Sequence, residues 1–112
     1  LKQQVEALTE KEFKVGVCIY YPHGNTGVDY HAAPAAFGKT NCLPSLSLGE
    51  ERQFSLRHNE SQKEFHIELA HGSLIVMGDK TQDLYEHALL KNPDYKGGRI
   101  NITFRQYGFT SV

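Results

Sequence analysis

The chain has 112 residues and a formal net charge of -1, and 39% of its residues are hydrophobic, 22% charged and 11% aromatic. This length suits one globular domain, which we place at residues 1–112, and excludes a comfortable second one. The near-neutral charge excludes an overall basic field, so a nucleic-acid partner would need a local basic patch. No apolar stretch approaches the roughly 20 residues of a membrane span, and the N-terminal residues lack a secretion-signal pattern. We therefore expect a cytoplasmic monomer with no membrane-spanning segment.

The expected secondary structure is one short helix followed by strands. Residues 1–13 carry apolar side chains at helical spacing among Lys, Gln and Glu, which predicts an amphipathic helix. From residue 15 the pattern alternates as in a strand, and this strand ends at the turn residues 22–27. Further strands are expected at 28–31, 42–48, 52–57, 64–69, 73–77, 85–89 and 99–107, with a single helical turn at 81–86. About eight short strands in one small domain predict an all-β sandwich or barrel, the jelly roll among them.

The most informative segment is Arg99-Ile-Asn-Ile-Thr-Phe-Arg105. Alternate residues of a strand share a face, so its apolar side chains point one way and its polar side chains point the other. The polar set comprises Arg99, Asn101, Thr103 and Arg105. One interpretation is an outer strand with a solvated polar face. The other is a strand that lines a polar cavity, where two guanidiniums on one face suit a small dicarboxylate.

Two of the six histidines stand out by their position in the expected strands. His31 ends the strand at 28–31, and His87 lies within the strand at 85–89. For any single histidine a surface or hydrogen-bonded role is the simpler interpretation. Two histidines from distant strands nevertheless commonly hold a divalent ion between facing sheets, and a non-haem iron triad adds one carboxylate.

Several motifs follow one another in a characteristic order. They are Tyr21-Pro-His-Gly24 followed by His31, Pro44-Ser-Leu-Ser-Leu-Gly49-Glu-Glu-Arg52-Gln-Phe54, His71-Gly-Ser-Leu-Ile-Val-Met-Gly78-Asp-Lys-Thr-Gln82, His87, and the final 99–105 segment. Over about residues 15–107 this order resembles the AlkB-like branch of the iron(II)- and 2-oxoglutarate-dependent dioxygenases. The last segment fits the R-x-N-x-T-F-R strand of that family at every fixed position.

The resemblance implies a double-stranded β-helix, a jelly-roll variant, with Fe(II) and 2-oxoglutarate as cofactors. It makes His31 and His87 the metal ligands. It pairs Arg99 with the distal carboxylate of 2-oxoglutarate and directs the Tyr21 hydroxyl to the same group. Asn101 and Arg105 would face the end nearest the metal. The implied reaction consumes oxygen and 2-oxoglutarate, releases succinate and carbon dioxide, and dealkylates methylated bases of DNA or RNA, as in DNA repair.

The chain departs from the family pattern at the first metal motif, which is His-x-Asp in the family and His31-Ala32-Ala33 here. Ile19 is a second departure, because the family usually has an Asn there. Four interpretations of Ala33 stay open: an Asp-to-Ala variant, a carboxylate supplied instead by Asp29, a chloride in the vacant position as in the related 2-oxoglutarate halogenases, or a catalytically dead domain that only binds a ligand. The last makes a non-catalytic binding module the alternative function.

Residues suited to gripping a nucleic acid are few. The basic candidates for phosphate contact are Lys39, Arg52, Arg57 and Lys63, which are too few for a patch. The candidates for a clamp around a flipped base are Tyr30, Phe37 and Tyr85, with ordinary packing as the simpler interpretation. AlkB-like enzymes recognise bases largely through a segment before the β-helix. Only one short helix occupies that place here, so we expect a reduced or missing recognition lid. The segment 94–98 is shorter than in many members of the family, so we expect an open pocket.

Overall fold

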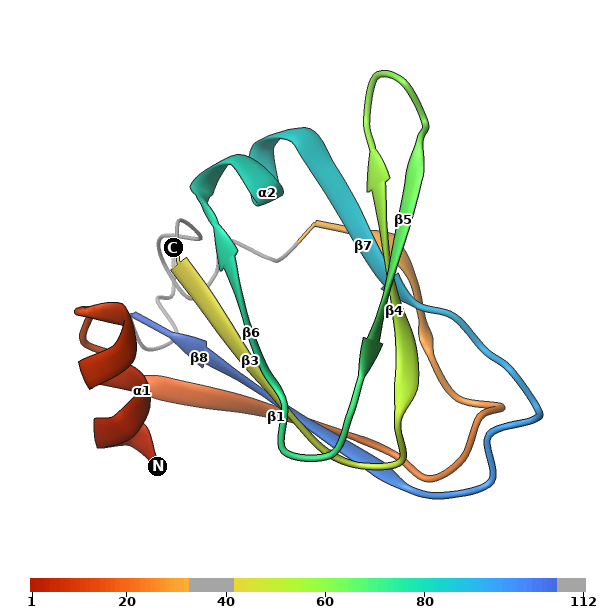
Figure 1. Cartoon of the computed structure of the whole chain (residues 1–112), viewed down its shortest axis with the longest axis horizontal. Helices are drawn as coiled ribbons and strands as arrows, with labels where there is room; N and C mark the ends of the chain where they lie inside the picture. Colours follow the sequence, from red (N-terminus) through yellow and green to blue (C-terminus); the bar gives the residue numbers. More distant parts are fainter. Residues whose placement is uncertain (33–41, 107–112) are drawn as a thin grey trace, which may run out of the picture.

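The structure is a computed structural model that describes residues 1–32 and 42–106 (Figure 1). Three residues singled out in the sequence lie outside the described residues: Ala33, Phe37 and Lys39. Position 107, the end of the last expected strand, lies outside them too. None of the helices in the described ranges has the length and apolar character needed to cross a membrane.

The elements follow the expected order closely. The described residues form α1 (Lys2–Thr9), β1 (Val15–Tyr21), β2 (Val28–His31), β3 (Cys42–Gly49), β4 (Arg52–His58), β5 (Glu64–Leu69), β6 (Leu74–Gly78), α2 (Asp79–Leu84), β7 (Tyr85–Leu89) and β8 (Arg99–Arg105). The first helix is shorter than the predicted 1–13, because Glu10 adopts a left-handed conformation with φ 58° and ends it. The helical turn expected at 81–86 begins two residues earlier, as α2.

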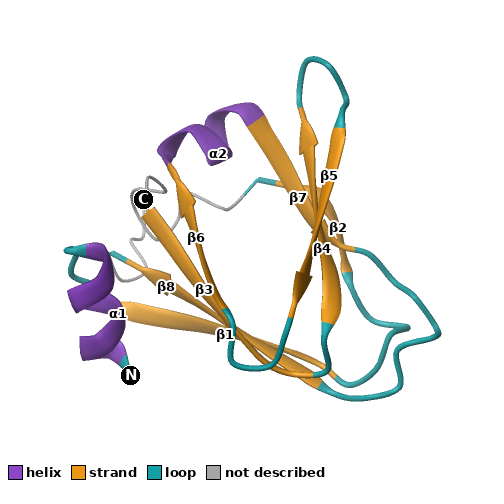
Figure 2. Cartoon of the chain, viewed as in Figure 1, coloured by secondary structure: helices purple, strands orange, loops and turns teal. Residues whose placement is uncertain are grey.

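The strands form two antiparallel four-stranded sheets, ordered β1-β8-β3-β6 and β2-β7-β4-β5 (Figure 2). The connections 22–27, 50–51, 70–73 and 90–98 pass between the sheets at one end of the molecule, which we call the crossing-loop end. At the opposite end, α2 leads from β6 to β7 (Figure 1). This alternation between facing sheets confirms the predicted all-β jelly roll.

Two apolar clusters stabilise the fold, one on each side of the first sheet. On its outer side, Val5 of α1 and Phe13 pack with Leu46 and Phe104, and the Phe13 and Phe104 ring centroids are 6.0 Å apart. Between the sheets lies the second cluster, which comprises Leu43, Phe54, Leu69 and Met77. The apolar face of β8 therefore points outward under α1, and its polar face points inward. The interpretation of β8 as an outer strand with a solvated polar face is wrong.

Candidate functional site

A cavity of about 240 Å³ lies between the two sheets. All six residues predicted to bind the metal or the co-substrate line it: Tyr21, His31, His87, Arg99, Asn101 and Arg105. Thr103 and Ser45 complete the polar part of the described lining, and the rest is apolar, so no Asp or Glu of the described chain contributes to it. The described lining of the cavity thus contributes two guanidiniums and no carboxylate.

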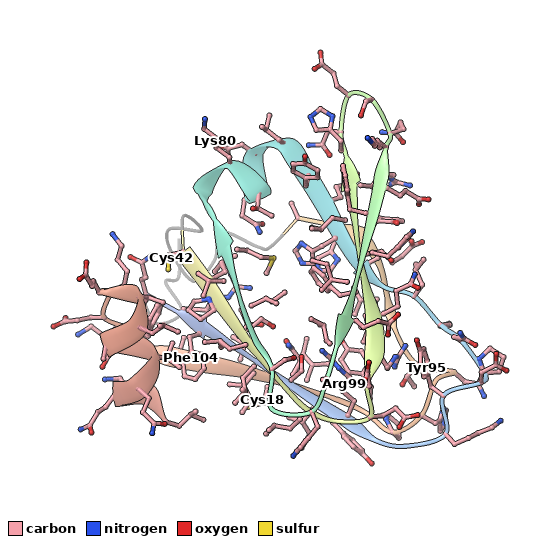
Figure 3. All side chains as sticks on the ribbon, in the orientation of Figure 1. Cys18, Cys42, Lys80, Tyr95, Arg99 and Phe104 are labelled. Atoms are coloured by element: carbon pink, nitrogen blue, oxygen red, sulfur yellow. The ribbon has the colours of Figure 1, made fainter. Side chains whose placement is uncertain are left out.

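The cationic wall is β8, which lies between β1 and β3 and is therefore held on both edges. Arg99 and Arg105 are 2% and 7% exposed, and burial lowers the pKa of both guanidiniums. Arg99 Nη2 donates to Ser47 Oγ at 2.6 Å, while its Nε is buried without a hydrogen-bond partner. Figure 3 shows Arg99 toward the crossing-loop end of the space between the sheets. A buried charge of this kind is costly unless an anion pairs with it, so this wall is suited to an anionic ligand.

Tyr21 lies beside Arg99, because the two residues are register partners in the β1–β8 ladder. The Arg99 Cζ is 5.9 Å from the Tyr21 ring centroid. Burial raises the pKa of the Tyr21 phenol, and the charges of Arg99 and Arg52 act in the opposite direction. The phenol is therefore protonated at neutral pH and can donate a hydrogen bond at the same place as the Arg99 guanidinium.

Asn101 and Thr103 are oriented by a short chain of hydrogen bonds. Thr103 Oγ1 donates to Asn101 Oδ1 at 2.9 Å, and Asn101 Nδ2 donates to Ser45 Oγ on the neighbouring strand β3. These contacts fix which way the amide of Asn101 points. The middle of the cationic wall is thus a preorganised polar surface rather than a set of loose side chains.

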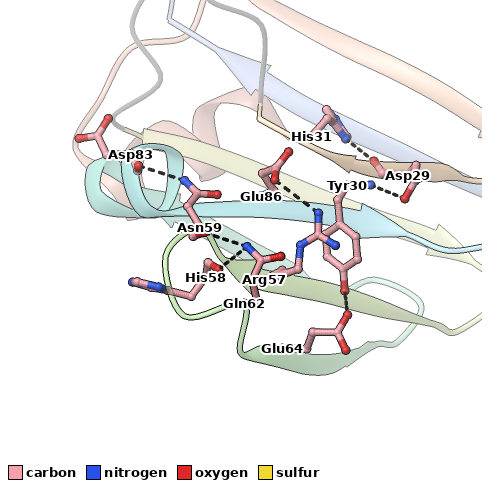
Figure 4. Close-up of polar contacts among 10 residues, drawn as sticks. All are labelled: Asp29, Tyr30, His31, Arg57, His58, Asn59, Gln62, Glu64, Asp83 and Glu86. Atoms are coloured by element: carbon pink, nitrogen blue, oxygen red, sulfur yellow. Dashed lines mark hydrogen bonds and ion pairs between the residues drawn. The ribbon is translucent and has the colours of Figure 1, made fainter.

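The two candidate metal ligands face each other as register partners of β2 and β7, with ring centroids 4.4 Å apart. His31 Nδ1 lies 2.9 Å from the backbone oxygen of Asp29 (Figure 4). When Nδ1 donates there, Nε2 is left with a lone pair for a metal. His87 stacks on Phe54, and its Nδ1 is buried without a hydrogen-bond partner. Burial, and next the charges of His31 and Arg105, lower the pKa of His87 to about 4.

These features fit a divalent metal held by two neutral imidazoles, one of which has an otherwise unsatisfied buried nitrogen. No group of three or more His, Cys, Asp or Glu side chains suited to a metal occurs in the described part of the chain. Asp29 is exposed, and its Oδ1 accepts the backbone N–H of Tyr30 (Figure 4). The interpretation of Asp29 as the third ligand therefore gains no support from the structure.

Most of the described residues considered for nucleic-acid contact interact with other side chains of this chain. Arg57 lies over the Tyr30 ring, 4.0 Å from its centroid, and forms an ion pair of 3.5 Å with Glu86 (Figure 4). The Tyr30 hydroxyl donates to Glu64. Lys63 Nζ lies over the Phe65 ring, and Tyr85 packs edge-on against His58 and Phe65. Arg52 is only 1% exposed, so its prediction as a surface phosphate contact is wrong.

This arrangement of histidines and arginines inside a jelly roll agrees with a known family. The model of the 2OG-Fe(II) oxygenase superfamily matches residues 1–105. The chain belongs to this superfamily. Among curated 2OG-Fe(II) oxygenase relatives it is 30% identical over 115 residues to alpha-ketoglutarate-dependent dioxygenase alkB homolog 3 of Bos taurus and of Homo sapiens, with 94% of this chain and 40% of each relative covered. It is 26% identical over 117 residues to DNA oxidative demethylase ALKBH2 of Bos taurus, with 95% of this chain and 41% of the relative covered.

The AlkB-like resemblance is therefore confirmed at the level of the family, and the fold agrees. The solved structure of OsALKBH1 superposes with a TM-score of 0.62 at 20% identity, covering 94% of this chain and 62% of that chain. This oxygenase chain spans about two fifths of the length of the curated relatives it matches.

Sequence reasoning missed two serines that hold side chains of the site in place. Ser45 and Ser47 hold Asn101 and Arg99, and both serines are almost fully buried. Their spacing of two residues in the strand predicted at 42–48 places them on one face, which is the available signal. The register that sets Ser45 opposite Thr103 and Ser47 opposite Asn101 is a long-range pairing, which alternation within one strand does not reveal.

Proposed function

We propose that this chain is the core of an Fe(II)- and 2-oxoglutarate-dependent dioxygenase that dealkylates methylated bases of DNA or RNA. The observation that carries the proposal is the shared cavity, which brings the facing pair His31 and His87 together with the buried cations Arg99 and Arg105. Family membership supports the cofactors, and the similarity to AlkB homologues, one of them a DNA oxidative demethylase, supports the substrate class.

The charge distribution suits 2-oxoglutarate, which carries a carboxylate at each end. Arg99 and Tyr21 lie at the start of β8 and the end of β1, at the crossing-loop end, and would hold the distal carboxylate. His31 and Arg105 end their strands at the opposite side of the cavity, where the keto-acid group would meet the metal. The dianion would be paired with the two buried guanidiniums of the described lining.

Fe(II) and 2-oxoglutarate, when bound, would supply the hydroxylation of a substrate C–H bond by molecular oxygen, with 2-oxoglutarate converted to succinate and carbon dioxide; a hydroxylated N-methyl group would then be released as formaldehyde. The protein's own side chains bind and orient the co-substrate. Arg99 and Tyr21 fix one end, Asn101 presents a fixed amide to the middle, and the apolar lining, which includes Leu43 and Met77, limits the access of water.

The proposal is tested first by an anaerobic titration of Fe(II) and 2-oxoglutarate, followed by the metal-to-ligand charge-transfer absorption. We expect a band in the wild-type chain. The band should be lost in His87→Ala, which removes a ligand, and should need much more 2-oxoglutarate in Arg99→Met, which removes the distal anchor. Repeating the titration with and without chloride separates a halide-filled site from a water-filled one. Absence of any band in the wild-type chain would contradict the proposal.

A second candidate function is a non-catalytic binding module that kept the cationic wall. It is favoured by the lack of a three-ligand group in the described residues and by Ala at position 33 of the sequence. The Ala33→Asp variant distinguishes the two functions, because it restores the His-x-Asp pattern. For an enzyme core we expect the metal affinity of Ala33→Asp to rise on the order of 10-fold or more, the size of effect that changes around a metal site commonly have. We also expect succinate to form when a methylated oligonucleotide is supplied. No gain in either quantity would favour the binding module.

A further inference from the structure

The crossing-loop end contains a second buried arginine that the proposed metal and co-substrate contacts do not use. Arg52, the first residue of β4, is 1% exposed and does not line the cavity. Its Nη2 donates to the backbone oxygens of Thr26 and Leu90, both at 3.0 Å. These two bonds connect it to the segments just before β2 and just after β7. Arg52 is therefore fixed from one side by backbone.

Arg52 also contacts two aromatic rings. Its Cζ lies 5.5 Å from the Tyr21 ring centroid and 5.3 Å from the Tyr95 ring centroid. Tyr95 is itself anchored, because its hydroxyl accepts the backbone N–H of Gln53 and its carbonyl accepts the N–H of Gly24. Tyr95 and Arg99 both lie toward this end in Figure 3. The planar guanidinium thus holds Tyr21 of one sheet against a loop that is bonded to the other sheet.

The charge of Arg52 has no direct acidic partner in the described part of the chain. The ion pairs Lys2–Glu6 and Arg57–Glu86 leave it out, and Glu50 acts on it by its charge without forming an ion pair. Two of its nitrogens, Nε and Nη1, are buried without a hydrogen-bond partner. A buried guanidinium without an acidic partner costs stability, because its lost hydration is only partly replaced. Such a costly group inside the fold points to a role for its charge and shape.

The Tyr21 ring is near both arginines, with the Arg99 Cζ at 5.9 Å and the Arg52 Cζ at 5.5 Å from its centroid. We propose that Arg52 is a positioning residue for co-substrate binding: it fixes the Tyr21 ring and adds positive potential, so that the Tyr21 hydroxyl and Arg99 together receive the distal carboxylate of the dicarboxylate ligand. This inference rests on the proposed function, since the phenol has a co-substrate role only if that ligand binds at the crossing-loop end.

The test compares three variants of the full chain. Arg52→Met keeps the volume and removes the charge, and Arg52→Lys keeps the charge without the planar fork. Arg57→Met is the matched control, because Arg57 lies on the same strand and also packs on a tyrosine ring, that of Tyr30, but lines no part of the cavity. The first measurement is 2-oxoglutarate affinity from the charge-transfer band. We expect Arg52→Met to weaken binding about 10-fold, Arg52→Lys to weaken it less, and Arg57→Met to leave it unchanged.

The second measurement is the ionisation of the Tyr21 phenol, followed by NMR of isotope-labelled tyrosine and assigned with Tyr21→Phe. Because the Arg52 charge lowers the pKa of Tyr21, Arg52→Met should raise it and Arg52→Lys should restore it. A double-mutant cycle of Arg52→Met with Tyr21→Phe should be strongly non-additive for 2-oxoglutarate affinity, since Arg52 acts through the Tyr21 hydroxyl that Tyr21→Phe removes. If Arg52→Met does not fold, Arg52→Lys and Arg52→Gln carry the same comparison.

Two results would overturn the inference while the proposed function stands: unchanged 2-oxoglutarate affinity in folded Arg52 variants, or additive effects with Tyr21→Phe. An unaltered Tyr21 ionisation in Arg52→Met would overturn it independently of the ligand. If the wild-type chain binds no 2-oxoglutarate at all, the proposed function fails, and the co-substrate role of Arg52 fails with it, even where the phenol titration shows the coupling.

Discussion

At the scale of single residues, His87 links the site to the pH dependence of folding. Its pKa is lowered to about 4 in the folded chain, whereas an unfolded histidine titrates near 6.5. Between these values the unfolded state binds more protons, so acid favours unfolding there. In metal-free protein we expect the free energy of unfolding to fall as the pH drops from 6.5 to 4, by at most about 3 kcal/mol.

Denaturant titrations across this range would measure that loss. His87→Gln removes the titrating group while keeping a polar side chain, so its stability should depend less on pH in the same interval. The comparison at pH 8, where His87 is neutral in both states, corrects for the packing change that the substitution itself causes. An equal pH dependence for the two proteins would show that His87 is not the group responsible.

Strand alternation predicted the polar face of β8, but it could not predict burial that depends on residues distant in sequence. Two-residue periodicity placed Arg99, Asn101 and Arg105 on one face, and the structure confirms that this face lines the cavity. Arg52 shows where the approach fails. A lone arginine in a strand is usually solvated, and its burial depends on Thr26, Leu90 and two tyrosines that are distant in sequence.

At the scale of elements, α1 supports the cavity wall from outside. Phe13, just after α1, is 1% exposed and packs on Phe104, which lies between Thr103 and Arg105 in β8. Its backbone N–H also donates to Glu6 Oε2 at 2.8 Å. The helix was predicted from its period of apolar residues, whereas the face that it covers was not. That face follows from the inward orientation of the polar β8 side chains, which makes the apolar side chains point toward α1.

Phe13→Ala should therefore destabilise the fold by about 3–5 kcal/mol, because it removes a fully buried ring and leaves a cavity against Phe104. Leu8→Ala is the matched control on the same helix, since Leu8 is 69% exposed and should cost no more than about 0.5 kcal/mol. Chemical denaturation followed by circular dichroism measures both. Similar losses in the two variants would mean that α1 contributes through helix formation rather than through this contact.

At the scale of the whole molecule, the cavity joins two sheets that contribute different chemistry. The sheet β1-β8-β3-β6 supplies the arginines and Tyr21, and the sheet β2-β7-β4-β5 supplies both histidines. The crossing connections bring these sheets together at one end, which is also where Arg99 and Tyr21 lie. The jelly-roll class was predictable from the number and spacing of the strands. His31 and His87 face each other because they are register partners of β2 and β7. This pairing joins residues 56 positions apart, and no local sequence pattern specifies it.

A ligand that contacts both sheets can bind only the folded chain, so it should stabilise the whole molecule. At 100 times its dissociation constant, such a ligand adds about 2.7 kcal/mol to the free energy of unfolding.

We expect Fe(II) with 2-oxoglutarate, under anaerobic conditions, to raise the denaturation midpoint well above that of the protein with the metal alone. 2-Oxopentanoate is the matched ligand, because it keeps the keto-acid end and lacks the distal carboxylate. In the wild-type chain, 2-oxopentanoate should stabilise the fold less than 2-oxoglutarate does. In Arg99→Met, where the Arg99 anchor is gone, the two ligands should stabilise the fold equally. Equal stabilisation by both ligands in the wild-type chain would place the dicarboxylate away from Arg99.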